Sequence, residues 1–98
     1  MTRIIDPEGR EIRALARAVR WRGARVLEVG CGDGRLTLRL ARLGTKVVGI
    51  DPAASDIRSA RQKLPKRFSN RIEYHVGTGT RLKQPSASFD VVLFSWSL

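Results

Sequence analysis

Cysteine, acidic residues and long apolar runs are all scarce in this chain. A single cysteine, Cys31, among 98 residues excludes an internal disulfide and a cysteine-based zinc site. No apolar run reaches the ~18 residues that a membrane-spanning helix needs. The first eleven residues are charged and lack the apolar stretch of a secretory signal. We therefore expect a cytoplasmic protein that does not enter a membrane.

Acidic residues number 9 against 19 basic ones, which gives a formal net charge of +10. Such an excess attracts polyanions, nucleic acid among them. The basic residues, however, are spread along the sequence from Arg3 to Lys83, and no aromatic residues alternate with them as a base-stacking surface would require. We expect this charge to reflect overall composition rather than a nucleic-acid site.

The hydrophobic pattern predicts helices that alternate with strands. After an irregular lead-in over residues 1–6, a first helix is expected from a cap at Asp6 to a stop at Gly23. Crossover helices are expected at 35–43, with Leu36, Leu40 and Leu43 on one face, and at 55–64, capped by Ser55. Strands are expected at residues 25–29, 45–51, 71–76 and 89–96.

This order of elements predicts an α/β fold with a Rossmann-like parallel sheet and flanking helices. Strands that alternate with helices form parallel βαβ units with right-handed crossovers. The sequence shows no internal repeat, low-complexity segment or linker, so residues 1–98 are expected to form a single domain.

The chemistry is expected in the loop Glu28-Val29-Gly30-Cys31-Gly32-Asp33-Gly34, which joins the first predicted strand to a helix. Glycines let the backbone turn sharply and let a ligand approach the main chain. Asp51 ends the next strand at the same predicted edge of the sheet, where a carboxylate can accept hydrogen bonds from ribose hydroxyls. The two features together indicate a pocket for a nucleoside-containing cofactor.

The loop favours a cofactor that carries positive charge. Its spacing is Gly-x-Gly-x-Gly, whereas the dinucleotide fingerprint is Gly-x-Gly-x-x-Gly. A pyrophosphate would also meet Glu28 and Asp33, and one like-charge pair at ~4 Å costs about 4 kcal/mol at an effective dielectric of about 20. An NAD-type dehydrogenase fragment stays open as a disfavoured alternative.

These residues resemble a known family. The stretch 26–34, Val-Leu-Glu-Val-Gly-Cys-Gly-Asp-Gly, is similar to the first motif of the class I S-adenosylmethionine-dependent methyltransferases. The stretch 47–51, Val-Val-Gly-Ile-Asp, resembles the second strand of that family, and the stretches 72–77 and 87–92 resemble the region through its fourth strand. The resemblance implies S-adenosylmethionine as the cofactor and covers roughly residues 20–98.

The resemblance also assigns cofactor-binding residues. The glycines of the loop would shape the bed for the methionine portion, Glu28 would organise the site for its amine, and Asp51 would hold both ribose hydroxyls. Where the family commonly has an acid that binds adenine, this chain has Thr78, a weaker neutral acceptor. The full expected set is Glu28, Gly30, Cys31, Gly32, Gly34, Asp51, Pro52, Thr78 and Gly79.

The resemblance implies a seven-stranded domain in the order 3-2-1-4-5-7-6, of which this chain carries four strands. We therefore expect a truncated, cofactor-binding part of a methyltransferase, with the last strand, 89–96, exposed at an edge. Such an apolar edge would promote self-association or pairing with a partner chain. The acceptor is expected to be a small molecule, with RNA or protein as alternatives.

No catalytic base and no metal ligand are assigned from the sequence. His75, the only histidine, lies among alternating charged residues and is expected at the surface. Cys31 is expected to be a small residue within a glycine turn rather than a nucleophile. A non-catalytic cofactor-binding or subunit-interaction module, completed by another chain, stays open as the second interpretation.

Overall fold

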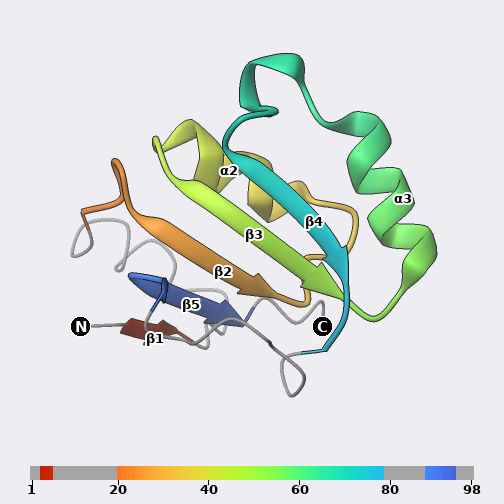
Figure 1. Ribbon diagram of the computed structural model, residues 1–98, viewed down its shortest axis with the longest axis horizontal. Coiled ribbons are helices and arrows are strands. Elements are labelled where there is room, and N and C mark those ends of the chain that lie inside the picture. Colours follow the sequence, from red (N-terminus) through yellow and green to blue (C-terminus); the bar gives the residue numbers. More distant parts are fainter. Residues whose placement is uncertain (1–2, 6–19, 79–87, 95–98) are drawn as a thin grey trace.

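The computed structural model describes residues 3–5, 20–78 and 88–94. Within them it contains a five-stranded, fully parallel sheet with the strand order β1-β5-β2-β3-β4 (Figure 1). The elements, in chain order, are β1 (Arg3–Ile5), β2 (Arg25–Val29), α2 (Arg35–Arg42), β3 (Lys46–Asp51), α3 (Ala54–Lys63), the short 3-10 helix η1 (Lys66–Phe68), β4 (Ile72–Val76) and β5 (Val91–Phe94). The Rossmann-like α/β fold is thus confirmed, and the order β4-β3-β2-β5 reproduces the expected 3-2-1-4.

Two expectations about the ends of the sheet are wrong. Residues 1–6 are not merely an irregular lead-in, because Arg3–Ile5 form β1 and pair in parallel with β5 from Arg3↔Val91 to Ile5↔Leu93. The last predicted strand is consequently not at an edge, since β5 lies between β1 and β2. β1 takes the position that the fifth strand has in the family order. Residues 6–19 of the first predicted helix and the predicted strand ends at 95–96 lie outside the described residues, whereas residues 20–23 are described and are not helical.

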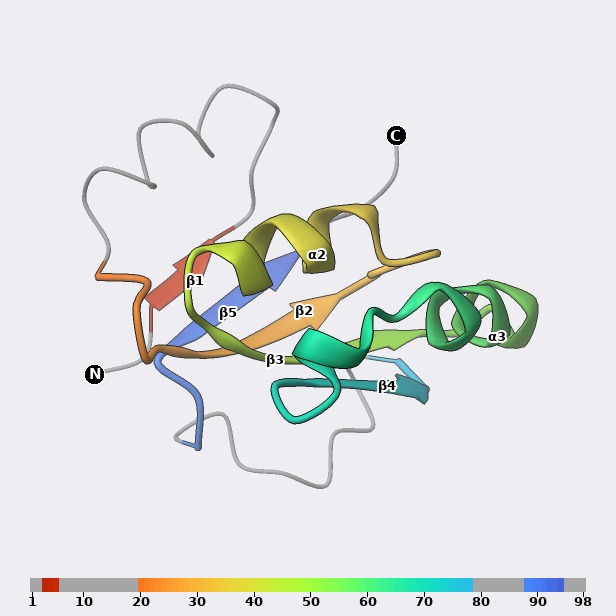
Figure 2. The ribbon, with the colours of Figure 1, turned by 90° about the horizontal axis from the view of Figure 1, so that it is seen from above.

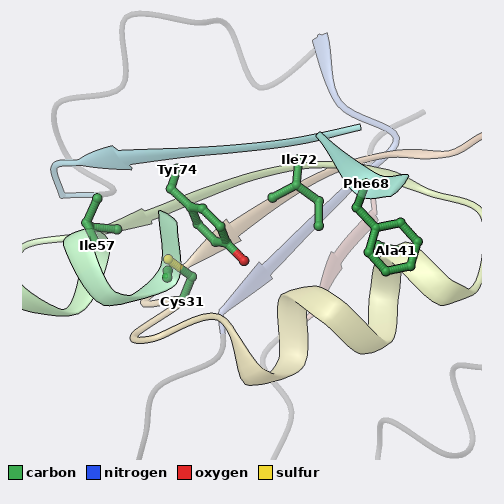
Figure 3. Packing of buried hydrophobic residues seen from close by; sticks show 7 residues of the cluster. Cys31, Ala41, Ile57, Phe68, Ile72 and Tyr74 are labelled. Atoms are coloured by element: carbon green, nitrogen blue, oxygen red, sulfur yellow. The ribbon is translucent and has the colours of Figure 1, made fainter. Parts of the chain in front are cut away.

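The helices α2 and α3 pack on one face of the sheet (Figure 2). Side chains alternate between the two faces of a strand, and Val26, Val47 and Val91 point toward α2, where Leu40 packs against them. α3 contributes Ile57 and Ala60 to a second cluster with β4 and the glycine loop (Figure 3); this cluster consists of Cys31, Ala41, Ile57, Ala60, Phe68, Ile72 and Tyr74. No helix of the described residues is long and apolar enough to cross a membrane.

The buried face of α2 differs from the predicted one. Leu40 is buried as expected, but Leu36 is only partly buried and Leu43, at the end of the helix, is 43% exposed. The inner positions are instead Thr37, Leu40 and Ala41. The helix ends at Arg42 because Gly44 follows with a left-handed φ of 87°, which stops the predicted helical run before Leu43 can pack inward.

The second predicted helix also begins differently. Ala53, not Ser55, occupies the cap position of α3, and it has no side-chain cap. The carboxylate of Asp51 accepts a hydrogen bond from the backbone N–H of Ala53 at 2.8 Å, so the acid at the end of β3 supports the entry to the helix. The other face of the sheet carries a third cluster, which consists of Leu27, Val29, Ile50, Phe89 and Val92 with Val48 and Phe94 at its margin.

Candidate functional site

The loop after β2 and the acid after β3 meet at the carboxyl edge of the sheet. Parallel strands bring their carboxyl ends to one edge, and β2 pairs with β3 from Arg25↔Lys46 to Val29↔Ile50. The backbone N–H groups of Gly30 and Cys31 both donate to the carbonyl of Ile50, at 2.8 and 3.0 Å. The loop is therefore fastened to the end of β3, beside Asp51.

The backbone of the loop has a shape that only glycine adopts readily. Gly30, Gly32 and Gly34 have φ values of 82°, 56° and 91°, all in the left-handed region. A Cβ placed on Gly32 would meet no atom within 4 Å, so open space lies above this residue. A ligand can approach the main chain there, as the glycine spacing predicts.

Asp51 faces this loop. Its Oδ2 accepts a hydrogen bond from the Gly32 N–H at 2.9 Å, while its Oδ1 accepts from Ala53. These bonds fix the plane of the carboxylate, and each oxygen keeps a further lone pair for another donor. The side chain is half-buried and can thus offer two adjacent acceptors to a pair of neighbouring hydroxyls.

Glu28 lies beneath the loop rather than at its surface. Its side chain is fully buried on β2, and its Oε1 accepts a short hydrogen bond from the Thr37 hydroxyl on α2. The Glu28 carboxyl group is thus held under the glycines, and in its ionised form it attracts a cation bound above them. Thr37 was not singled out from the sequence, although a polar residue at an inner helical position was a signal that could have identified it.

The two acids of the loop have different surroundings. Asp33 forms ion pairs with Lys63 at 3.1 Å and with Arg35 at 3.7 Å. The hydrogen bond from Lys63 is the main reason why the pKa of Asp33 lies below its ordinary value. The repulsion expected from Asp33 toward a phosphate is thus partly offset by these cations. Glu28, rather than Asp33, is therefore the main acid that disfavours a phosphate at the loop.

Cys31 is buried against β3 and is not activated. Burial, followed by the charges of Glu28 and Asp51, raises the pKa of its thiol to about 12. A thiol with this pKa stays protonated at neutral pH and is a poor nucleophile. This agrees with its interpretation as a small residue within a glycine turn.

The remaining predicted positions lie along the same edge. Pro52 follows Asp51 directly and is exposed, and Thr78 is exposed two residues beyond the end of β4. The segment before Thr78 is tied to this edge, because Gly77 donates its N–H to the carbonyl of Asp51 at 3.0 Å. Gly79 lies outside the described residues. His75 is exposed and lies 4.0 Å from Glu73, away from the loop, as expected for a surface residue.

One group of basic residues that are far apart in the sequence lies together at the opposite end of the sheet. Each parallel strand begins at the same edge, so the residues that precede β2, β3 and β4 come together. The exposed basic side chains there are Arg20, Arg22, Arg25, Arg42, Lys46, Lys66 and Arg67. Arg67 and Arg71 also lie over the Phe68 ring, at 4.8 and 4.9 Å from its centre. Other basic residues, Arg35 and Lys63 among them, lie beside the glycine loop instead.

The site's donors and acceptors fit a nucleoside attached to a cation. Asp51 supplies paired acceptors for ribose hydroxyls, and the open backbone at Gly32 admits a ligand. The buried Glu28 carboxyl group lies under the loop, where it suits a ligand with a positive charge better than one with a phosphate. S-adenosylmethionine, with an ammonium and a sulfonium, matches this set in its chemistry.

Known proteins support the same interpretation. Residues 26–98 match the family described as "Methyltransferase domain". The chain is 42% identical over 72 residues to the ubiquinone biosynthesis O-methyltransferase of Azorhizobium caulinodans, a match that covers 74% of this chain and 28% of that protein. The human mitochondrial ubiquinone biosynthesis O-methyltransferase is 40% identical over 76 residues, which cover 74% of this chain and 21% of that protein. The chain thus spans less than a third of these relatives.

Solved structures share the fold. An S-adenosylmethionine-dependent methyltransferase from Mesorhizobium loti has a TM-score of 0.71 and 27% identity, and the match covers 86% of this chain and 38% of that one. The [4+2]-cyclase SpnF has a TM-score of 0.67 and 30% identity over 72% of this chain and 27% of its own. The fold, the glycine loop and the sequence match agree, and the chain belongs to the methyltransferase domain family.

Proposed function

We propose that this chain forms the cofactor-binding part of an S-adenosylmethionine-dependent O-methyltransferase. The observation that carries the proposal is the pairing of Asp51 with the open glycine loop: its carboxylate is fixed by the N–H groups of Gly32 and Ala53 beside a backbone that leaves room for a ligand. When bound, the cofactor supplies an electrophilic methyl group on a sulfonium.

The residues of this chain bind and orient in this proposal. Asp51 holds the ribose hydroxyls and thereby sets where the sulfonium lies relative to the loop. Glu28 attracts the ammonium from beneath, while Pro52 and Thr78, which lie along the same edge, contact the adenine. Methyl transfer gains most from alignment, and holding two reactants in the correct geometry can lower a barrier by ~7–11 kcal/mol. No catalytic base is assigned to this part of the protein.

The acceptor in this proposal is a hydroxyl group of a small molecule in ubiquinone biosynthesis. The names of the relatives that match at 38–44% identity support it. RNA is the less favoured acceptor, because the names of these relatives point to a small molecule. The relatives include mitochondrial proteins, so the cytoplasmic location stays a prediction from the sequence.

A second candidate is a cofactor-binding module without methyl transfer, completed by another chain. The match to SpnF at 30% identity supports this candidate, because SpnF shares the fold and is named for a reaction other than methyl transfer. Association with a second chain stays a proposal as well. A further strand could pair with the described sheet at the edge of β1 or of β4, or in place of β1 beside β5.

Isothermal titration calorimetry with S-adenosylmethionine tests the proposal. Asp51→Ala removes the two charge-assisted hydrogen bonds that the carboxylate accepts from the ribose hydroxyls in this proposal. Each such bond contributes about 1.5–3 kcal/mol. A net loss of about 2–4 kcal/mol corresponds to roughly 30- to 1000-fold weaker binding. Glu73→Gln is the matched control, because it also removes one negative charge but lies exposed on β4, outside the site.

The outcomes separate the candidates. The proposal expects binding by the unchanged chain and by Glu73→Gln, a large loss in Asp51→Ala, and no binding of NAD. Equal affinity in all three proteins would refute the site, and tighter binding of NAD would support the dehydrogenase alternative. Transfer of a labelled methyl group to a hydroxyl-bearing small-molecule acceptor would distinguish the enzyme from the module.

A further inference from the structure

One row of residues crosses the sheet directly beneath the glycine loop. The register pairs Glu28 on β2 with Gly49 on β3, and Gly49 with Tyr74 on β4. Side chains of paired residues in a parallel sheet project to the same face, here the face covered by α2 and α3. Because Gly49 has no side chain, the Tyr74 side chain can extend across β3 toward Glu28.

Two glycines leave the space that Tyr74 fills. A Cβ on Gly49 would lie 3.1 Å from Tyr74 Cδ1 and 3.0 Å from Cys31 Sγ. A Cβ on Gly34, the residue that precedes α2, would lie only 2.5 Å from the Tyr74 hydroxyl. The tyrosine ring is 4% exposed and lies close to Cys31, with its hydroxyl directed toward α2 (Figure 3). A glycine inside a strand marks such a close approach.

The hydroxyl of Tyr74 joins a chain of hydrogen bonds. It is hydrogen-bonded to Thr37, whose own hydroxyl donates to Glu28 Oε1. The Thr37 hydroxyl thus stands between the Tyr74 hydroxyl and the Glu28 carboxyl group. Burial raises the pKa of Tyr74 to about 12, and the hydroxyl therefore keeps its proton at neutral pH.

The backbone of Tyr74 is anchored independently of its ring. Its carbonyl accepts a hydrogen bond from Arg61 Nη2 on α3 at 2.6 Å. The ring thus starts from a fixed point on β4 and ends at the N-terminus of α2. Tyr74 thus contacts β3, α3 and the start of α2, and its hydroxyl lies near the buried Glu28 carboxyl group on β2.

We propose that Tyr74 and Thr37 are positioning residues that hold the Glu28 carboxylate beneath the glycine loop for the ammonium end of the cofactor. This rests on the proposed function, since it assumes that a cation binds above the loop. The two hydroxyls act through Glu28 and do not touch the ligand. Removal of these hydroxyls should lower the affinity for ligands that carry the amino-acid group. The affinity for ligands with the nucleoside portion alone should stay unchanged.

Two ligands separate positioning from simple packing. S-adenosylhomocysteine carries the amino-acid group, whereas 5′-methylthioadenosine has the same nucleoside and sulfur without it. Calorimetry with both is expected to give about tenfold weaker binding of S-adenosylhomocysteine to Tyr74→Phe and Thr37→Val, because one hydrogen bond in the row is lost. Binding of 5′-methylthioadenosine should change by less than about twofold, and Thr37→Ser should restore the unchanged affinity.

Thr45→Val is the matched control for Thr37→Val. Thr45 is also fully buried, and its hydroxyl donates to the carbonyl of Leu40 at 2.7 Å, apart from the loop. We expect Thr45→Val to lower the melting temperature without changing the ratio of the two affinities. Equal losses for both ligands in Tyr74→Phe and Thr37→Val, or no loss for either, would overturn the inference. Absence of binding to the unchanged chain would instead refute the proposed function.

Discussion

Gly49→Ala tests whether the row beneath the loop is as tightly packed as the structure indicates. A Cβ at this position would lie 3.0 Å from Cys31 Sγ, 3.1 Å from Cys31 Cβ and 3.1 Å from Tyr74 Cδ1. Contacts this short force both neighbours to move, and both are buried with little free space. The added methyl group therefore acts as overpacking rather than as a filled cavity.

The size of the effect follows from two opposing terms. Overpacking a core typically costs about 1–3 kcal/mol, while replacing a strand glycine by alanine recovers roughly 0.5–1 kcal/mol of backbone entropy. The free energy of unfolding should fall by about 1–2 kcal/mol, a shift of roughly 4–16 °C in melting temperature for a domain of this size. Binding of S-adenosylhomocysteine should weaken too, because Tyr74 is displaced from Thr37.

Urea denaturation followed by far-UV circular dichroism measures this change. Gly77→Ala is the control, since a Cβ there would meet no atom within 4 Å and the residue does not need a left-handed backbone. That variant should match or slightly exceed the stability of the unchanged chain. If Gly49→Ala were as stable as Gly77→Ala, the close packing of Tyr74 and Cys31 over β3 would be refuted.

Three further predictions concern the thiol, the adenine position and the edge of the sheet. Iodoacetamide at pH 8 should alkylate Cys31 about a thousandfold more slowly in the native chain than in the urea-unfolded chain. A rise of the thiol pKa from 9.0 to about 12 lowers the thiolate fraction by about that factor. Comparable rates would show that the thiol is not buried as described. Thr78→Asp should tighten binding of S-adenosylmethionine by about five- to tenfold in calorimetry, because a charged acceptor bonds more strongly to an amino group, while Thr78→Asn should not; equal affinities would remove Thr78 from the adenine site. Deletion of residues 1–5 should expose the backbone of β5 and increase the mass seen by light scattering; an unchanged mass would show that β1 does not protect this edge.

The parts of the fold that follow from local pattern were predictable. The strand at Arg25–Val29 matches its prediction residue for residue, because Val26, Leu27 and Val29 form a short apolar segment between Gly23 and the glycine loop. The resemblance of the loop and of Asp51 to one family located the edge of the sheet. Here the sequence signal and the physical requirement, glycines with left-handed φ beside a carboxylate, coincide.

The features that depend on distant partners were not predictable. Arg3–Ile5 is too short to mark itself as a strand, and its pairing is set by β5, almost ninety residues away in the sequence. Nothing local in the sequence reveals that the Tyr74 hydroxyl meets Thr37. Gly49 could have raised the question, because a glycine inside an apolar strand indicates close approach.

The group of basic residues at one edge of the sheet also depends on residues that are distant in the sequence. Arg25, Lys46 and Arg71 are far apart in the sequence, yet each stands at the beginning of a parallel strand. Only the topology brings them to one edge of the sheet, opposite the glycine loop. Their positions in the sequence alone therefore do not reveal this group.

The central claim is that the loop after β2 and the acid after β3 bind S-adenosylmethionine. A titration of the ¹⁵N-labelled chain, followed by two-dimensional ¹H–¹⁵N spectra, tests it residue by residue. We predict that the amide signals of Gly30, Gly32 and Ala53 shift with the ligand, while those of Lys46 and Arg71 at the opposite edge stay in place. Saturable shifts confined to the basic edge, or no shifts at all, would contradict the account.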